Sequence, residues 1–107
     1  MLDNRLAIGH YALVVWRPEQ RDHWPEWHAP SDATRASISA VLRMMAEHKV
    51  HPEMAVSWAT SIAPPQGDHV ATVAWTRLLG ATTTIDPSSY LYVEADFAAW
   101  ADDIDSA

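Results

Sequence analysis

The sequence contains no cysteine, so disulfide bonds, thiolate zinc sites, iron–sulfur clusters and a cysteine nucleophile are all excluded. It has only three glycines, which lie too far apart to form a phosphate-binding loop. No Gly-x-Ser-x-Gly motif occurs, so no serine has the context of a hydrolase nucleophile. We therefore expect neither nucleotide binding nor serine catalysis, and we assign no catalytic residue and no cofactor.

Long hydrophobic runs are also missing. The longest apolar run, residues 11–16, is far too short to span a bilayer. The first four residues include two polar ones and do not resemble a signal peptide. We expect a cytoplasmic protein that does not bind membranes.

Basic residues are scarce, and none follows Arg77. The last thirty residues nevertheless carry six acidic side chains, which account for most of the net charge of -7. A field this one-sided repels nucleic acid and anionic membranes and attracts basic partners. We therefore expect no direct binding of nucleic acid. Arginine outnumbers lysine six to one, a ratio typical of high-GC genomes such as those of actinobacteria and their phages.

The composition is otherwise that of a globular protein, with 49% hydrophobic and 20% charged residues. A chain of 107 residues is the size of one ordinary domain, and it can bury roughly two thirds of the surface that it exposes when unfolded. We expect a single globular domain over residues 1–107. Because each of its six tryptophans carries an N–H that needs a partner, several of these rings should lie half-buried.

The first half of the chain predicts a strand, a loop and a helix. Residues 9–16 are β-branched and aromatic, which indicates a central strand that ends before Pro18. Three prolines and weak periodicity predict a long ordered loop over residues 17–30. A helix is predicted over residues 31–49, with Ser31 as its N-cap. Its buried face should consist of Ile38, Val41, Leu42 and Met45.

The next two elements are predicted to be a strand and a helix. Apolar and small residues alternate over residues 54–60, which favours a second strand. Residues 69–79 favour a helix with Asp68 as N-cap and Gly80 at its C-terminal end, although β-branched residues leave a strand over 70–76 as the rival. The buried stripe of this helix should consist of Val70, Val73, Ala74 and Leu78.

The C-terminal part predicts a hairpin of two strands, over residues 81–86 and 90–95, joined by the turn sequence Asp-Pro-Ser-Ser. Residues 96–104 could add a short helix. The order β-α-β-α-β-β predicts an α+β fold: a small two-layer sandwich with a mixed sheet of about four strands and two helices.

The segment from His23 to His28 is the most unusual local feature, because two tryptophans, two histidines and Glu26 share one proline-stiffened loop. One interpretation is a recognition loop, since tryptophan is a common hot spot of protein interfaces. The alternative, which we favour, is that Trp24 and Trp27 close over the predicted sheet as a lid, with the histidines in solvent.

The histidines are weak candidates for metal ligands. His23 and His28 share their loop with Glu26, and His48 and His51 flank a predicted helix end near two glutamates. Neither pair matches a known ligand spacing, so no metal site is assigned. A protonated His48 would also suit the C-terminal end of a helix dipole.

The acidic C-terminal region is the second candidate surface. It could be a solvated face, a docking surface for a basic partner or a mimic of DNA phosphates. Mimicry is the least favoured, because six acids in thirty residues are sparse. Across both surfaces the candidate contact residues are Trp24, Glu26, Trp27, Glu94, Asp96, Trp100, Asp102, Asp103 and Asp105.

These features favour a small, acidic, non-enzymatic protein that binds another protein with a basic surface. Its size suits an accessory or inhibitor protein, for example one encoded by a phage or a mobile element. Two alternatives stay open: a small metal-dependent or acid–base enzyme that uses the histidines and glutamates, and a structural homo-oligomer.

Overall fold

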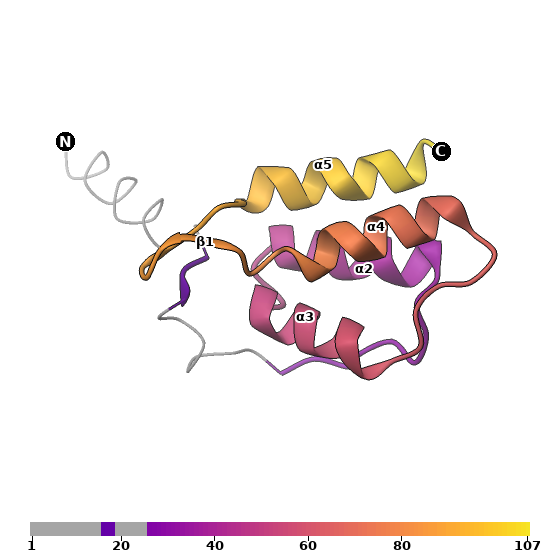
Figure 1. Cartoon of the computed structure of the whole chain (residues 1–107), viewed down its shortest axis with the longest axis horizontal. Coiled ribbons are helices and arrows are strands. Elements are labelled where there is room, and N and C mark those ends of the chain that lie inside the picture. Colours follow the sequence, from indigo (N-terminus) through magenta and orange to yellow (C-terminus); the bar gives the residue numbers. More distant parts are fainter. Residues whose placement is uncertain (1–15, 19–25) are drawn as a thin grey trace.

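The computed structural model describes residues 16–18 and 26–107 (Figure 1). Within these ranges it has four helices and one two-stranded antiparallel sheet, so the predicted sandwich with a mixed sheet of about four strands is wrong. The helices are α2 (Arg35–Ala46), α3 (Pro52–Ser61), α4 (His69–Leu79) and α5 (Glu94–Asp105), and the strands are β1 (Thr84–Asp86) and β2 (Ser89–Tyr90).

Helix α2 confirms the helix predicted over residues 31–49, but its start is set by Thr34 rather than by Ser31. The Thr34 hydroxyl accepts a hydrogen bond from the Ser37 backbone N–H at 3.1 Å, and the Ser37 hydroxyl accepts one from the Thr34 N–H at 2.7 Å. This reciprocal capping box satisfies two of the backbone donors that a helix start leaves unpaired. The four residues predicted for its buried face are fully buried: Ile38, Val41, Leu42 and Met45.

Helix α3 replaces the strand that was predicted over residues 54–60. Pro52 occupies the first turn, where its missing N–H costs no hydrogen bond, and the His51 side chain caps the helix by accepting from the Glu53 N–H. The buried side chains include Ala55, Trp58 and Ala59, whose spacing of three and four residues is helical. Alternation along the sequence was therefore misleading, because small alanines and serines fit a helix as well as a strand.

Helix α4 confirms the helix predicted over residues 69–79, and the rival strand is wrong. The Asp68 carboxylate accepts hydrogen bonds from the backbone N–H groups of Val70 and Ala71, and it also binds Arg35 at 2.6 Å. The Arg35 guanidinium, together with these amides, lowers the pKa of Asp68. The helix ends at Gly80, as expected.

The hairpin is confirmed, but both strands are shorter than predicted. β1 begins at Thr84 rather than at residue 81, and α5 begins inside the predicted strand 90–95. The Asp96 carboxylate accepts a hydrogen bond from the Val93 N–H at 2.8 Å, and Glu94 adds a second acid to the first helical turn. Both favour a helix start through capping and through the helix dipole. The predicted short helix over 96–104 is thus confirmed in a longer form.

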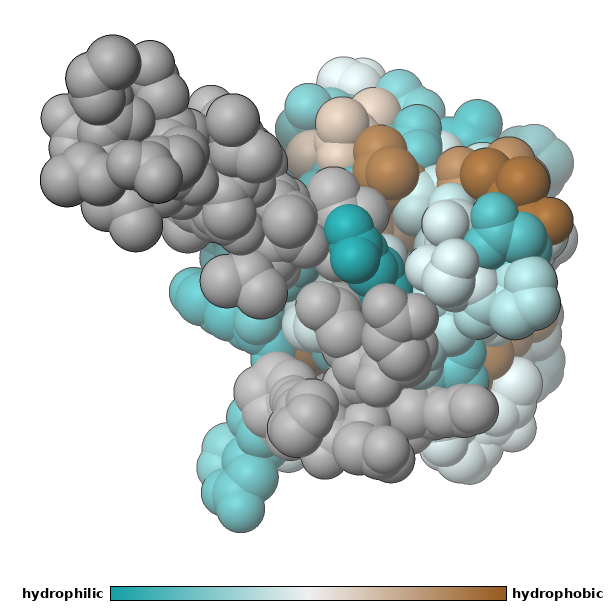
Figure 2. Space-filling view, turned by 90° about the vertical axis from the view of Figure 1, so that its left-hand side faces the viewer, coloured by the Kyte–Doolittle hydropathy of each residue, from teal (hydrophilic) through white to brown (hydrophobic). Residues whose placement is uncertain are grey.

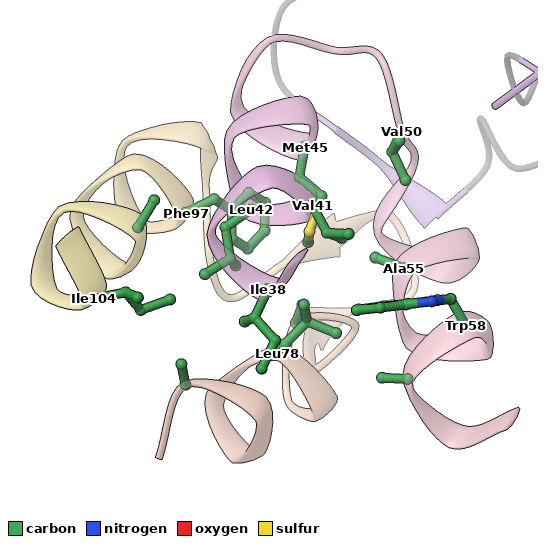
Figure 3. Packing of buried hydrophobic residues seen from close by; sticks show 14 of the residues in the cluster. Ile38, Val41, Leu42, Met45, Val50, Ala55, Trp58, Leu78, Phe97 and Ile104 are labelled. Atoms are coloured by element: carbon green, nitrogen blue, oxygen red, sulfur yellow. The ribbon is translucent and has the colours of Figure 1, made fainter. Parts of the chain in front are cut away.

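The core is built around α2, which packs against each of the other three helices (Figure 1). In Figure 3 the buried face of α2 lies between side chains from α5 on one side and side chains from α3 and α4 on the other. The labelled partners are Phe97 and Ile104 from α5, Leu78 from α4, and Ala55 and Trp58 from α3. This arrangement leaves α4 and α5 side by side, with a groove between them.

Two predictions fall wholly or partly outside the described residues. The strand over 9–16 is described only at Trp16, which is buried and belongs to no strand. Of the predicted loop over 17–30, residues 26–30 form neither helix nor strand, as expected. Within the described ranges, no helix is both long and apolar enough to cross a membrane.

Candidate functional site

A groove of about 310 Å³ lies between α4 and α5. On each helix the lining side chains recur at three- and four-residue intervals, so each helix presents one continuous stripe to the groove. The stripe on α4 contains His69, Val70, Val73, Ala74 and Arg77, and the stripe that begins on α5 contains Trp100, Asp103, Ile104 and Ala107. The groove therefore lies between two helix faces, and on each face the lining side chains recur at helical intervals.

Trp100 forms part of the groove wall with its ring held in place by two other aromatic side chains. The ring stands edge-on to Tyr92, with centroids 4.9 Å apart, and to Phe97, with centroids 5.6 Å apart. Phe97 is fully buried, whereas Trp100 is half-buried and packs on the core from outside. The groove thus exposes part of an indole ring that two neighbouring aromatic side chains hold in position.

On the opposite wall, Val73 departs from its prediction. It was expected in the buried stripe of the 69–79 helix, but 39% of its surface is exposed. Val70 is half-buried, while Ala74 and Leu78 are buried as predicted. The buried stripe of α4 instead runs through Ala71, and this rotation leaves Val73 facing out of the core.

The rim of the groove is charged. Arg77 on α4 and Asp103 on α5 form an ion pair of 2.9 Å across it. On the flank of α5 that faces α2, Arg43 binds the carboxylates of both Asp102 and Asp105. The Arg43 guanidinium, followed by the Ser39 hydroxyl, lowers the pKa of Asp105. Three carboxylates therefore lie near the end of α5, and all three remain at least half exposed.

The other two predicted acids of α5 lie apart from this cluster, at the start of the helix. Asp96 caps the helix, so its carboxylate is engaged by the backbone. Glu94 is only 13% exposed, and its carboxylate contacts the His48 ring and accepts a hydrogen bond from the Trp16 backbone N–H at 3.0 Å. Burial raises the pKa of Glu94. The predicted acidic region is therefore two groups of residues, and only the group around Asp103 reaches the groove.

The aromatic loop is described in part, since His23 and Trp24 lie outside the described residues. Glu26 and His28 are exposed. Trp27 is half-buried and stands edge-on to Trp58, with ring centroids 6.3 Å apart. Both rings line a second hollow, of about 270 Å³, together with Ala29, Met54, Ser57 and Ser61. Trp27 thus packs on α3 and not on a sheet, so the lid predicted to close over the sheet is wrong in what it covers. The hollow shares no residue with the α4–α5 groove.

Of the four histidines that are weak metal candidates, His48 and His51 have other contacts, His28 is exposed and His23 lies outside the described residues. His48 lies against Glu94 and stacks on Trp16, and His51 caps α3. Over residues 16–18 and 26–107, no three acidic or histidine side chains gather closely enough to hold a metal ion. His48 also adopts a positive φ of 61°.

The chain matches no family model, no curated protein and no solved structure. A function must therefore be argued from the groove itself.

The groove contains two of the predicted contact residues, Trp100 and Asp103, and adds two that the sequence reasoning missed. Arg77 was noticed only as the last basic residue, and Val73 was assigned to the core. The signal that could have found them is the equal spacing of the two stripes, because residues 70, 73, 74 and 77 repeat the intervals of residues 100, 103, 104 and 107.

Apolar surface also occurs at the hairpin end of the molecule, where Figure 2 shows separate brown areas among teal ones. The exposed large apolar residues in and after the hairpin are Ile85, Leu91 and Val93. Scattered exposed residues of this kind are normal in soluble folds. We assign them no role.

Proposed function

We propose that this protein is a small non-enzymatic binding protein, and that its α4–α5 groove accepts a basic amphipathic helix of another protein. The observation that carries the proposal is one groove that combines an apolar wall with the Asp103 carboxylate. Two further carboxylates, those of Asp102 and Asp105, lie on the neighbouring flank of α5. A helix that lies in a groove inserts side chains at i, i+3, i+4 and i+7. The groove stripes on α4 and α5 have the same intervals.

Trp100 is the proposed anchor of the interface. Tryptophan is among the residues that most often dominate interface energies. Its ring is already held by Tyr92 and Phe97, so little side-chain freedom is lost when a partner packs on it. Val73 supplies apolar contact from the opposite wall.

The charges of α5 favour a basic partner. The helix carries five acidic residues and no basic one. Asp102, Asp103 and Asp105 lie at its C-terminal end, where the helix dipole already places partial negative charge. Among the described residues, Arg43 and Arg77 are the cations paired with these three carboxylates. A lysine or arginine of the partner would therefore be attracted both by the remaining negative charge and by the helix end.

A second copy of this chain is a poorer occupant than a basic protein, because each copy has a net charge of -7. This argues against the homo-oligomer, although the oligomeric state in solution is an outcome to be measured. An accessory or inhibitor protein, encoded by a phage or mobile element and located in the cytoplasm, remains the expected biological setting. Neither nucleic acid nor a membrane is proposed as a direct partner.

The direct test is the binding of a fluorescent model peptide of about 18 residues, helical, with leucines at i, i+3, i+4 and i+7 and lysines beside them. We expect saturable binding by fluorescence anisotropy that weakens as salt is added. Val73→Asp and Trp100→Ala should each weaken binding at least about tenfold. Asp103→Asn should weaken it less and reduce its salt dependence.

The matched controls lie outside the groove. Trp27→Ala removes an equally large half-buried ring, and Asp32→Asn removes an equally exposed acid. Both should bind like the unchanged protein. Equal affinity for a peptide of the same composition in scrambled order, or loss of binding with Trp27→Ala but not with Val73→Asp, would contradict the proposal. Circular dichroism of each variant separates loss of binding from loss of fold.

A further inference from the structure

His51 is a fully buried polar side chain at the junction between α2 and α3. Its Nδ1 accepts a hydrogen bond from the Glu53 backbone N–H at 3.0 Å, so the ring itself is the N-cap of α3. Serine, threonine, aspartate and asparagine are the usual N-cap residues. Unlike all of these, a histidine loses its acceptor nitrogen when it is protonated near neutral pH.

The second ring nitrogen connects His51 to a distant part of the chain. Its Nε2 lies 3.3 Å from the backbone carbonyl oxygen of Arg17. Since Nδ1 acts as acceptor, the neutral ring carries its proton on Nε2 and can donate it to that carbonyl. One neutral imidazole thus links the first turn of α3 to residues 16–18.

Trp16 lies in the same cluster. Its indole N–H donates to the Met45 carbonyl at 2.7 Å, and its ring stacks on His48 with centroids 4.3 Å apart. The Trp16 ring also stands edge-on to the His51 ring, with ring centroids 4.8 Å apart. Residues 16–18 belong to no strand and no α-helix, and these side-chain contacts are among those that join them to the body.

We propose that His51 is an acid-sensitive latch, whose protonation opens the first turn of α3 and releases residues 16–18 while α2, α4 and α5 stay folded. A proton on Nδ1 would place an N–H opposite the Glu53 N–H, so two donors would face each other and the cap would be lost. The new charge would also lie in a site with no exposed surface. The opening stays local because the α2–α5 core does not depend on this hydrogen bond.

Several ionisable groups surround the latch. His48 follows the C-cap of α2, and burial together with repulsion from His51 lowers its pKa. From α5, the Glu94 carboxylate is engaged by His48 and by the Trp16 N–H. Within α3, the Glu53 carboxylate accepts a hydrogen bond at 3.0 Å from Tyr90 on β2.

Each of these groups affects the latch differently. Arg17 is exposed to solvent. The Tyr90 ring stands edge-on to the His51 ring, with ring centroids 6.0 Å apart. The Glu53 carboxylate would attract a protonated His51, but the Glu53 backbone N–H is the donor that such a proton would oppose. Attraction by that carboxylate therefore cannot restore the lost cap.

The expected size of the effect follows from proton linkage. Assume that the closed form binds no proton on His51 and that in the open form this side chain titrates like free histidine, near pH 6.5. The ratio of open to closed molecules then rises about tenfold for each pH unit below 6.5. The test is solvent exchange measured by NMR on the intact chain, expressed as protection factors. These factors already correct for the pH dependence of intrinsic exchange.

We expect protection of the Glu53 amide and of the Trp16 indole N–H to fall together, about tenfold per unit between pH 6.5 and 5.0. The Ala71 amide is the internal control, because it is capped by the carboxylate of Asp68 rather than by a histidine. The Phe97 amide reports on the core. A protection factor of the Glu53 amide that does not change with pH would overturn the proposal. An equal fall in the protection factor of the Phe97 amide would overturn it as well.

Two variants identify the sensor. His51→Asn keeps a side-chain acceptor at the N-cap but removes the titration, so protection at Glu53 should no longer depend on pH. His48→Asn removes the neighbouring base at a positive φ that asparagine tolerates, and the pH dependence should remain. If the dependence disappears in His48→Asn and persists in His51→Asn, then His51 is not the latch.

Discussion

Truncation of Phe97 should test the packing of α5 on α2. The Phe97 side chain has no exposed surface and lies against α2 in the centre of the core (Figure 3). Phenylalanine-to-alanine changes at such sites typically cost about 3–5 kcal/mol of unfolding free energy, because they remove apolar contact and leave a cavity. A loss of about 4 kcal/mol corresponds to roughly a thousandfold shift toward the unfolded state.

Urea unfolding, followed by far-ultraviolet circular dichroism, measures this loss. The control is Ile85→Ala in the hairpin, where 67% of the side chain is exposed and the change should be under about 0.5 kcal/mol. If Phe97→Ala leaves no folded protein, Phe97→Leu should cost about 1.5 kcal/mol or less and allow the comparison. A loss below about 1 kcal/mol for Phe97→Ala would refute the packing of α5 on α2.

Three smaller predictions follow from individual contacts. Tyr90→Phe removes the buried hydroxyl that donates to Glu53 and should cost about 0.5–1.5 kcal/mol in urea unfolding. Arg43→Gln leaves two carboxylates of α5 without their cation, so at low salt the melting temperature should fall further than in the exposed control Lys49→Gln. The difference between the two variants should be smaller at 1 M salt. The lowered pKa of His48 means that its neutral form is favoured by folding, so stability should decline as pH falls below about 6.5, and less so in His48→Asn.

Each of these results has an outcome that would contradict it. An unchanged unfolding free energy for Tyr90→Phe would mean that the hydroxyl is solvated in both states. A melting temperature of Arg43→Gln that drops equally at all salt concentrations would exclude an electrostatic cause. The raised pKa of Glu94 acts in the opposite sense to His48, because its protonated form is favoured by folding. If the free energy of unfolding instead rises steadily as the pH falls from 7 to 5, the contribution of Glu94 outweighs that of the histidines.

The sequence predicted the elements whose signals are local. Asp68 and Gly80 bound α4 as expected, and the turn residues before Ser89 placed the hairpin. The strand predicted over 54–60 was wrong because the deciding features lie just before it, in the ring of His51 and in Pro52. A histidine N-cap is not visible as a helix signal in the sequence, since its role depends on the ring geometry.

The candidate site was predicted less well than the helices. Trp100 and Asp103 were named, but the acids were treated as one field, whereas the structure divides them among a helix cap, a half-buried pair and an ion-paired cluster. Their counter-charges come from Arg43 and Arg77, on other helices, and such tertiary pairs cannot be read from local patterns. Val73 was misassigned because a helical stripe fixes the relative positions of side chains, but not which way the helix faces.

The central claim is that the α4–α5 groove is the binding site, and NMR mapping of the model peptide on the isotope-labelled chain tests it most directly. The account predicts that the largest amide and indole shift changes fall on α4 from Val70 to Arg77 and on α5 from Trp100 onward, with saturation at one peptide per chain. Changes centred instead on Trp27 and Trp58, or shifts no larger than those caused by a scrambled peptide, would contradict it.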